Sequence, residues 1–509
     1  MRIWIINPFD DLPCEGKAQR FWSLSATLAD QGHEVIWWSS DWSHRRKAKR
    51  VGLEDLKDLK VGRCEGEKVE RCEGEPPLRS LSDAGQEGRG LGGATTNDPG
   101  STLNFQLRLV ATPPYRKNIS LARILNHRVF GRTLYRDACA AIDSGALAQP
   151  DGILASLPPM EGPIAALRLR ARYGCRVITD VMDAWPETLL QALSGPPRSS
   201  STLSMRGKWL MRLGRLALWP YAHMLRRACS ESDAVSAQSE TFAAFAKAHG
   251  ASGAVHVCYL GGAVPADSAN SANVEHRTSN VEGRTKGSAN VELGTRNVVG
   301  TSGHPSLTTA PKGIIKATDG ANSEVSTPNQ QLRKLRLLYL GAMGRSYDLD
   351  TILDALELLD QEGLSVECVF VGDGEKRAQL EARQVAGVRF TGFLQGEALA
   401  RELSAADLGV VPFFSQSGVA IPYKAGDYLA YGLPLLNTIE GELAELVQRF
   451  HCGMTYPVLN PEALAAAIRE YADDRERLRL EQRQAYACFD AHFNRAKTYP
   501  EFAKWLVGG

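Results

Sequence analysis

The cysteines of this sequence lack the spacings that are typical of disulfide scaffolds and metal sites. Ten cysteines are spread over 509 residues, with no C-x-x-C pair and no Cys/His cluster. Zinc sites and disulfide scaffolds need grouped cysteines, so we expect no metal site and reduced, mostly buried thiols in a cytoplasmic protein. The chain also lacks the roughly 18 consecutive apolar residues of a membrane-spanning helix. Its first residues, MRIWIINPFDD, are too short in apolar length for a signal peptide and predict a strand.

The chain also carries almost no net charge. The chain has 59 basic and 58 acidic residues, giving a formal charge of +1. This excludes a general attraction to nucleic acid, so any basic patch must be local. With 43% hydrophobic residues, a chain of this length can form two or three globular domains.

The first half alternates short apolar runs with helical periodicity. An apolar run at 2–6 precedes a loop containing Gly16, a helix at 18–31 and a second strand at 34–39. This order opens a doubly wound parallel sheet. Further strands are predicted at 107–111, 152–157, 176–181, 232–238 and 255–260.

Two stretches have neither apolar periodicity nor enough apolar residues to form a core. Residues 62–100 contain RCEGE twice and are otherwise rich in Gly, Pro and Ser. Residues 263–333 repeat NVEHRT, NVEGRT and NVELGT between polar residues. We interpret both as disordered insertions, the first in a surface loop and the second in an inter-domain linker.

Two segments of the first half, 116–136 and 203–227, contain basic residues but no acidic ones. The second also contains Trp209 and Trp219 among leucines. Basic residues beside tryptophan and leucine suit an interfacial helix that contacts anionic lipid. An amphipathic helix packed on the sheet with a solvated basic face explains the same pattern.

The second half is organised around residues 408–442. An apolar strand at 408–412 leads through a loop of small residues to a helix that opens near Pro422 and ends at Gly432. Lys424 lies in the first turn of this helix, where a cation opposes the helix dipole and an anionic ligand offsets that cost. Asp427, three residues later, can accept hydrogen bonds from sugar hydroxyls. A βαβ unit with a solvated lysine and aspartate is the alternative.

The string PYKAGDYLAYGLP at 422–434 resembles the donor-site signature P-S-K-x-x-E-Y-x-A-x-G-x-P of family 4 retaining glycosyltransferases. This group acts in cell-surface polysaccharide or glycolipid synthesis. The family carries two glutamates separated by seven residues; Asp427 stands at the second position and Val419 at the first. Residues 183–187, DAWPE, resemble the D-L-W-P-E motif of the same branch.

The resemblance implies a GT-B fold, in which two Rossmann-like, doubly wound α/β domains face a central cleft. Residues 1–262 form the acceptor-side domain and 263–333 the linker insertion. Residues 334–484 form the nucleotide-sugar domain, and 485–509 a last helix that returns to the first domain. Strands are predicted at 335–340, 366–371 and 388–391, and helices at 349–359, 399–406 and 461–481.

The resemblance also assigns the site residues. The catalytic set is Arg345, Lys424, Asp427 and Asp183. Donor-binding residues are Gly344, Gly372, Gly374, Phe393, Gly418, Val419 and Glu442, and Gly16 lies on the acceptor side. No cofactor or metal is implied, because the nucleotide sugar is the substrate.

The implied activity is retaining, metal-independent hexosyl transfer from a nucleotide sugar to a glycan or lipid-linked acceptor, with no nucleic-acid partner. The enzyme would act in the cytoplasm, at the inner face of the cell membrane if it contacts anionic lipid there. Two alternatives stay open: a nucleotide-sugar epimerase of the same fold, and a non-catalytic subunit that binds nucleotide sugar.

Overall fold

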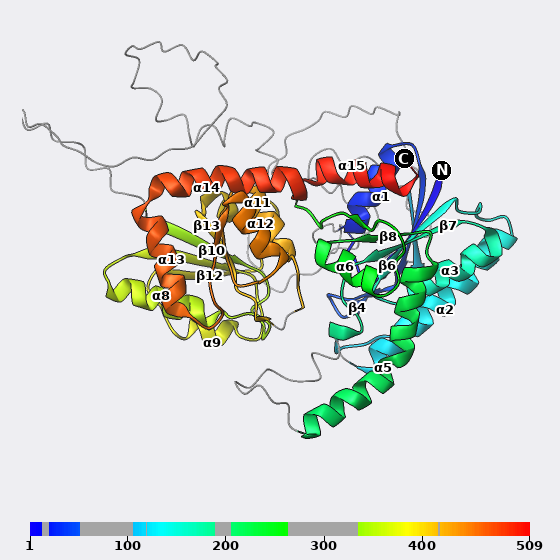
Figure 1. The fold of residues 1–509 in the computed structure, drawn as a ribbon, viewed down its shortest axis with the longest axis horizontal. Helices are drawn as coiled ribbons and strands as arrows, with labels where there is room; N and C mark the ends of the chain where they lie inside the picture. Colours follow the sequence, from blue (N-terminus) through cyan, green and yellow to red (C-terminus); the bar gives the residue numbers. More distant parts are fainter. Residues whose placement is uncertain are drawn as a thin grey trace, which may run out of the picture.

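The computed structural model describes residues 1–12, 20–50, 105–118, 120–188, 205–262, 334–415 and 418–508. Both predicted insertions and Gly16 lie outside these residues. Two α/β domains lie side by side, and the C-terminal helices run along one side of both (Figure 1). The fold class predicted from the sequence, two Rossmann-like domains, is confirmed.

The N-terminal domain is built on seven parallel strands in the order β5-β2-β1-β6-β7-β8-β9. These are β1 (Arg2–Ile6), β2 (Glu34–Ser40), β5 (Phe105–Val110), β6 (Gly152–Leu157), β7 (Arg176–Val181), β8 (Ala234–Ala237) and β9 (His256–Val257). A short hairpin, β3 (Trp42–Ser43) and β4 (Ala48–Lys49), follows β2. The central strands are apolar along their length because helices cover both faces of the sheet.

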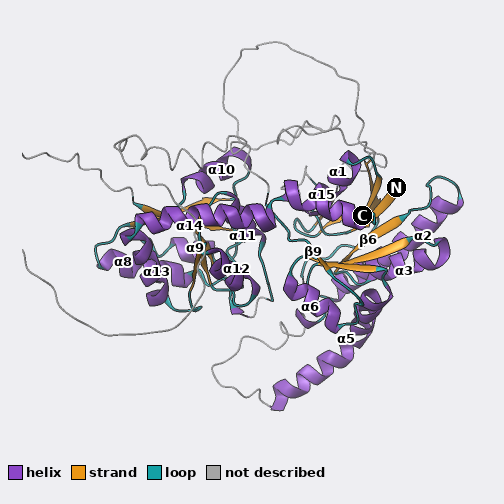
Figure 2. Cartoon of the chain, turned by 45° about the horizontal axis from the view of Figure 1, so that its top comes forward, coloured by secondary structure: helices purple, strands orange, loops and turns teal. Residues whose placement is uncertain are grey.

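Successive residues of β1 belong to different cores. Ile3 and Ile5 pack with α1 (Arg20–Asp30) and the C-terminal α15 (Arg495–Leu506), whereas Trp4 and Ile6 pack with α2 (Leu121–Asp143) and α3 (Glu161–Tyr173). This alternation is the two-residue period of a strand. Helices α5 (Met205–Glu231) and α6 (Glu240–Ala248) complete the domain, and α5 projects away from its body (Figures 1 and 2).

The C-terminal domain has six parallel strands in the order β12-β11-β10-β13-β14-β15. They are β10 (Leu335–Leu340), β11 (Val366–Val371), β12 (Val388–Gly392), β13 (Leu408–Val411), β14 (Leu435–Asn437) and β15 (Gly453–Thr455). The helices between and after them are α8 (Asp350–Gln361), α9 (Arg377–Glu381), α10 (Gly396–Ala405), α11 (Tyr423–Ala430), α12 (Glu442–Phe450) and α13 (Pro461–Asp473).

The helix predicted at 461–481 is two helices. Asp474 ends α13 and caps α14 (Arg475–Cys488), its carboxylate accepting a 2.8 Å hydrogen bond from the Arg477 amide. A π-helical turn, η5 (Phe489–Phe493), then leads into α15, which packs on α1 of the first domain. This break was not predicted from the sequence because the apolar periodicity continues across it, whereas the cap depends on one side chain.

The two domains meet closely where the N-terminal domain ends. A Cβ added to Gly262 would lie 2.9 Å from the Gly426 carbonyl oxygen, so only glycine lets the two backbones approach. Gly262 also pairs with Asn494, just before α15. No described helix combines the length and apolarity needed to cross a bilayer.

Candidate functional site

Three loops meet at the carboxyl ends of β10, β11 and β12, where open α/β sheets bind ligands. Gly372 has a φ of +135°, and a Cβ there would lie 2.0 Å from the Gly341 carbonyl oxygen. Gly374 has a φ of +159°, and its Cβ would lie 2.5 Å from the Met343 carbonyl oxygen. These two predicted donor-binding glycines therefore allow the β11 loop to pack against the backbone of the β10 loop.

Lys424, in the first turn of α11, is the central side chain of this region. It is only 7% exposed, and its ammonium nitrogen has no hydrogen-bond partner among the described residues. The nitrogen lies 4.2 Å from the ring centroid of Tyr339, 4.3 Å from that of Tyr347 and 5.1 Å from that of Phe413. We call these three rings the aromatic box.

Burial holds the pKa of Lys424 well below its usual value. The rings attract a cation but cannot replace the hydrogen bonds of water. An anionic group bound next to this nitrogen would favour its charged form and complete its hydrogen bonding. The nitrogen lies 3.0 Å from the position of a Cβ on Gly341, beside the glycine loop.

Asp427 lies one turn further along α11 and is partly exposed. The next residue, Tyr428, is buried, and its hydroxyl accepts a 2.6 Å hydrogen bond from the Leu340 amide at the end of β10. This contact fixes α11 against the sheet. Gly418 is exposed with a φ of +65°, and Val419 packs at the edge of the core that contains α11.

The remaining predicted donor residues lie further out. Arg345 is 86% exposed and forms a 3.1 Å ion pair with Glu375. A Cβ added to the neighbouring Gly344 would meet no atom within 4 Å, so this loop borders open space. Phe393 is 63% exposed, and the guanidinium carbon of Arg45 in the other domain lies 5.9 Å from its ring centroid.

Glu442, predicted beside the donor, contacts the N-terminal domain. Its carboxylate accepts hydrogen bonds of 2.8 to 2.9 Å from the amides of Glu240 and Thr241, the Thr241 hydroxyl and the Tyr259 hydroxyl. Glu240 and Thr241 open α6, whose N-terminal amides and dipole favour a carboxylate. In this structure, Glu442 joins the two domains.

On the facing domain, Asp183 lies directly after β7 in a partly buried loop. It accepts a 3.0 Å hydrogen bond from Thr188, and burial raises its pKa. Arg123 of α2 opposes that shift and lies 5.0 Å from the Trp185 ring centroid. Arg123 belongs to the segment 116–136, which the sequence predicted to face lipid or solvent, but its side chain lies within this cluster.

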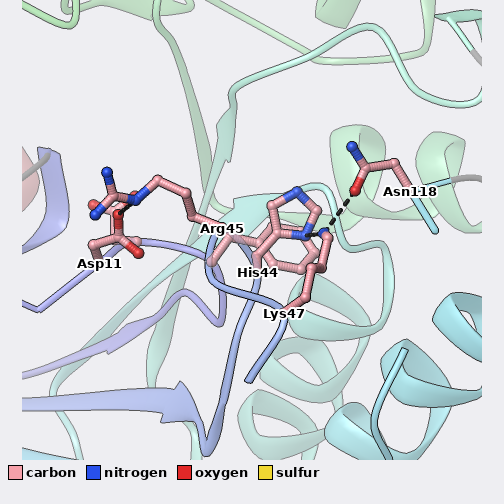
Figure 3. Close-up of a pocket in the computed structure, with 7 residues that line it drawn as sticks. Asp11, His44, Arg45, Lys47 and Asn118 are labelled. Atoms are coloured by element: carbon pink, nitrogen blue, oxygen red, sulfur yellow. Dashed lines mark hydrogen bonds and ion pairs between the residues drawn. The ribbon is translucent and has the colours of Figure 1, made fainter. Parts of the chain in front are cut away.

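A pocket of about 410 Å³ lies nearby. It is lined by Phe9, Asp10, Asp11, His44, Arg45, Lys47 and Asn118, some of which Figure 3 labels. None of these residues was predicted from the sequence, because the β3–β4 hairpin that carries three of them has no motif. Among the described residues no group of three or more His, Cys, Asp or Glu side chains is arranged to hold a metal ion.

The C-terminal domain carries the sequence match to a known family. Residues 334–474 match the family model for glycosyl transferases group 1. Over 181 residues it is 26% identical to the amylovoran biosynthesis glycosyltransferase AmsK of Erwinia amylovora. The aligned part is 34% of this chain and 42% of that relative, so less than half of the relative is matched.

Solved structures resemble the chain over its whole length. Sucrose-phosphate synthase from Thermosynechococcus elongatus superposes with a TM-score of 0.57 at 12% identity, covering 99% of this chain and 98% of that one. Anabaena HepE in complex with UDP superposes with a TM-score of 0.52 at 10% identity, covering both chains completely. At such identities the likeness shows the fold, which is GT-B.

Proposed function

We propose that this chain is a retaining, metal-independent hexosyltransferase that uses a nucleotide-sugar donor. The observation that carries the proposal is the buried Lys424 nitrogen beside the Gly341 loop, which no described residue hydrogen-bonds, in the domain that matches the family. A diphosphate is the ligand that fits, because its charge compensates the buried cation and its oxygens accept from the amine. HepE, of the same fold, is described in complex with UDP and with UDP-glucose, which supports a nucleotide-sugar donor.

In this proposal Lys424 stabilises the negative charge that develops on the leaving diphosphate as the glycosidic bond breaks. Arg345 reaches the same phosphates after exchanging its exposed Glu375 partner for them. An exposed ion pair contributes little free energy, so this exchange is inexpensive. Asp427 binds sugar or ribose hydroxyls, and Asp183 lies on the acceptor side of the cleft.

The acceptor we propose is a glycan or a lipid-linked glycan of cell-surface polysaccharide synthesis. The name of the Erwinia relative, which refers to amylovoran biosynthesis, supports this context. The enzyme would act at the cytoplasmic face of the cell membrane, where such acceptors are anchored.

A nucleotide-sugar binding panel, followed by product analysis with lipid-linked acceptors, tests the proposal. Lys424→Ala and Arg345→Ala should each lower turnover roughly a hundredfold with the correct donor, as loss of one charge-stabilising group commonly does. The control is Arg389→Ala, which removes another exposed arginine of the same domain. Arg389 pairs with Glu402, which is distant from the glycine loops in the sequence. Wild-type turnover in both test variants would show that the phosphate site is elsewhere.

The same panel separates the alternatives. An epimerase would interconvert free nucleotide sugars without acceptor, and a non-catalytic subunit would bind donor with no product under any condition. The replacement of the family's two glutamates by Val419 and Asp427 is the observation that keeps these alternatives in the experiment.

We also propose that the N-terminal domain contacts an anionic membrane. On α5, Leu213, Leu216 and Trp219 are 42%, 72% and 63% exposed, and on α2 Leu121 and Leu125 are 83% and 54% exposed. Both helices contribute to one core cluster, α5 through Leu218 and α2 through Ile124. Exposed apolar side chains beside basic ones suit a lipid interface.

Liposome co-sedimentation tests this contact. Each lysine or arginine near an anionic surface contributes about 1 kcal/mol, so binding should require anionic lipid and weaken at high salt. It should fall in the Leu216→Gln/Trp219→Gln variant and in the variant with Arg206, Lys208, Arg212 and Arg215 changed to Gln. Leu480→Gln, which alters a 48% exposed leucine on α14, is the control. Equal binding to neutral and anionic vesicles, or to neither, would contradict the proposal.

A further inference from the structure

The pocket of about 410 Å³ lies where three neighbouring strands of the N-terminal sheet end. Asp10 and Asp11 follow β1, the His44–Lys47 turn follows β2, and Asn118 follows β5. Strands β5, β2 and β1 are adjacent and parallel, so their carboxyl ends meet at one edge. Arg45, which lines the pocket, also lies over Phe393 of the C-terminal domain, so the pocket borders the cleft between domains.

Positive charge gathers at one end of the pocket, where Lys47 is a lining residue and Arg123 contacts the lining residues Phe9 and Asn118. The Lys47 ammonium donates a 2.6 Å hydrogen bond to the Asn118 side chain and lies 4.8 Å from the Tyr115 ring centroid. The Arg123 guanidinium donates to the Asn118 carbonyl at 2.8 Å. Within the described residues, neither cation forms an ion pair with a carboxylate. Burial and the charge of Arg123 lower the pKa of Lys47 to about 8.

Two neutral imidazoles surround these cations. Arg123 Nε donates to His127 Nε2 at 3.3 Å, which leaves the proton of His127 on Nδ1. That Nδ1 is buried and has no partner among the described residues. His44 Nδ1 lies 3.4 Å from the Lys47 nitrogen and hydrogen-bonds the Tyr115 hydroxyl. Burial and the neighbouring cations lower the pKa of both imidazoles to about 3, so neither adds charge.

The backbone at Lys47 is also unusual. Lys47 has a φ of +53°, a conformation that residues with a Cβ rarely adopt and that costs of order 1 kcal/mol or more. The hairpin holds it there through a 3.0 Å hydrogen bond from its amide to the Ser43 carbonyl. The strained turn directs the lysine toward Asn118 (Figure 3).

The other end of the pocket carries carboxylates. Asp11 pairs with Arg45 at 2.6 Å, and the buried Asp10 accepts a 2.8 Å hydrogen bond from the Phe21 amide. In Figure 3 the Asp11–Arg45 pair lies on one side of the pocket and His44, Lys47 and Asn118 lie on the other. A ligand that fills both ends needs hydroxyl donors at one end and an anion at the other.

We propose that this pocket binds the acceptor through a phosphate, and that the acceptor is a glycosyl phosphate or glycosyl diphosphate. The phosphate lies between Lys47 and Arg123 and accepts hydrogen bonds from them, and the sugar hydroxyls face Asp10 and Asp11. This inference rests on the proposed function, because it names the acceptor of that transfer. A phosphate supplies the negative charge that the two cations lack, and its oxygens accept from several donors at once.

Calorimetry with the full-length chain and inorganic pyrophosphate is the first test. Because pyrophosphate can also occupy the donor site at Lys424, the acceptor pocket is measured in Lys424→Met, which should keep pyrophosphate binding at this pocket. In that background Lys47→Met and Arg123→Gln should each weaken the remaining binding at least tenfold. The control is Lys49→Met, which alters a 60% exposed lysine in the same hairpin. Lys47→Arg keeps the charge and should restore most of the affinity, which separates loss of the site from loss of the fold. Binding lost in Lys424→Met but kept in Lys47→Met would place the anion at the donor site and overturn the proposal.

The second test distinguishes the sources of the phosphate. Transfer assays compare a soluble glycosyl phosphate with a lipid-linked glycosyl diphosphate in detergent micelles, and with the same sugar lacking phosphate. In either phosphate-bearing form, Lys47→Met should raise the acceptor KM at least tenfold with little change in the donor KM. Equal use of the phosphate-free sugar, or an unchanged acceptor KM, would overturn the proposal. Binding of UDP, measured separately, reports on the proposed function alone.

Discussion

Removing one partner of the Arg20–Asp180 ion pair should destabilise the N-terminal domain more than any surface substitution. Both side chains are at most 1% exposed. Arg20 Nε and Nη2 donate to the two oxygens of Asp180 at 2.9 and 3.2 Å, and Nη1 donates to the Cys258 carbonyl at 2.7 Å. The Ser236 hydroxyl donates to the same carboxylate at 2.7 Å. The pair thus joins α1, β7 and the last segment of the domain.

The expected magnitude follows from the charge that is left behind. Asp180→Asn removes the counter-charge from a fully buried guanidinium, and Arg20→Met leaves a buried carboxylate with the Ser236 hydroxyl. Breaking a buried pair in this way costs about 3–5 kcal/mol. Ser236→Ala removes one hydrogen bond to a charged group and should cost about 1.5–3 kcal/mol. Arg227→Gln, which disrupts an exposed pair with Glu231, should cost less than about 1 kcal/mol.

Tryptophan fluorescence during urea unfolding is the assay. All nine tryptophans lie in the N-terminal domain or in α15, so the fluorescence reports on the unit that contains the pair. The Arg20→Met/Asp180→Leu double variant should be less destabilised than the sum of the two single variants, because no lone charge is then buried. Single variants that cost less than about 1 kcal/mol, or costs that simply add, would refute the argument.

Three further predictions concern other contacts. Burial of Glu161 raises its pKa from 4.5 to about 7, so the folded protein keeps a proton there and its stability falls as pH rises from about 4.5 to 7. Glu161→Gln should therefore stabilise the protein by up to about 3 kcal/mol above pH 7 and not at pH 4. Thermal unfolding at several pH values checks this. Gly372→Ala should destabilise by at least about 2 kcal/mol because of its contact with Gly341, whereas Gly344→Ala should be near neutral in the same unfolding assay. Glu442→Gln should speed amide hydrogen exchange at the start of α6 while the core of that domain keeps its protection; unchanged exchange there would contradict the inter-domain role.

The strands that are buried on both faces of a sheet could be predicted from the sequence. The predicted ranges 152–157, 176–181, 335–340 and 366–371 coincide with β6, β7, β10 and β11. Each is a short apolar run bounded by polar or glycine residues, and a buried parallel strand needs nothing else. Helix α11 was also predictable, because Pro422 and Gly432 mark its ends.

The side-chain environments were not predictable, because they depend on residues that are distant in the sequence. Tyr339 is the next-to-last residue of β10, Tyr347 lies in the following loop and Phe413 follows β13, yet all three surround one lysine nitrogen. Arg123 looked like one member of a solvated basic segment until the fold placed it beside Trp185. No local pattern records which face of a helix meets a loop sixty residues away.

Two of the buried cations among the described residues show how structural and functional charges differ. Arg20 is fully buried and its guanidinium is bonded to a carboxylate and to backbone carbonyls. Lys424 is almost equally buried, but no described residue offers its nitrogen a hydrogen bond. Burying an unpartnered amine costs several kcal/mol, and nothing in the packing of α11 requires a nitrogen there, since methionine would fill the same space. The cost is offset only when an anion binds, so Lys424→Met should stabilise the unliganded protein and abolish the stabilisation that a nucleotide diphosphate gives the native chain.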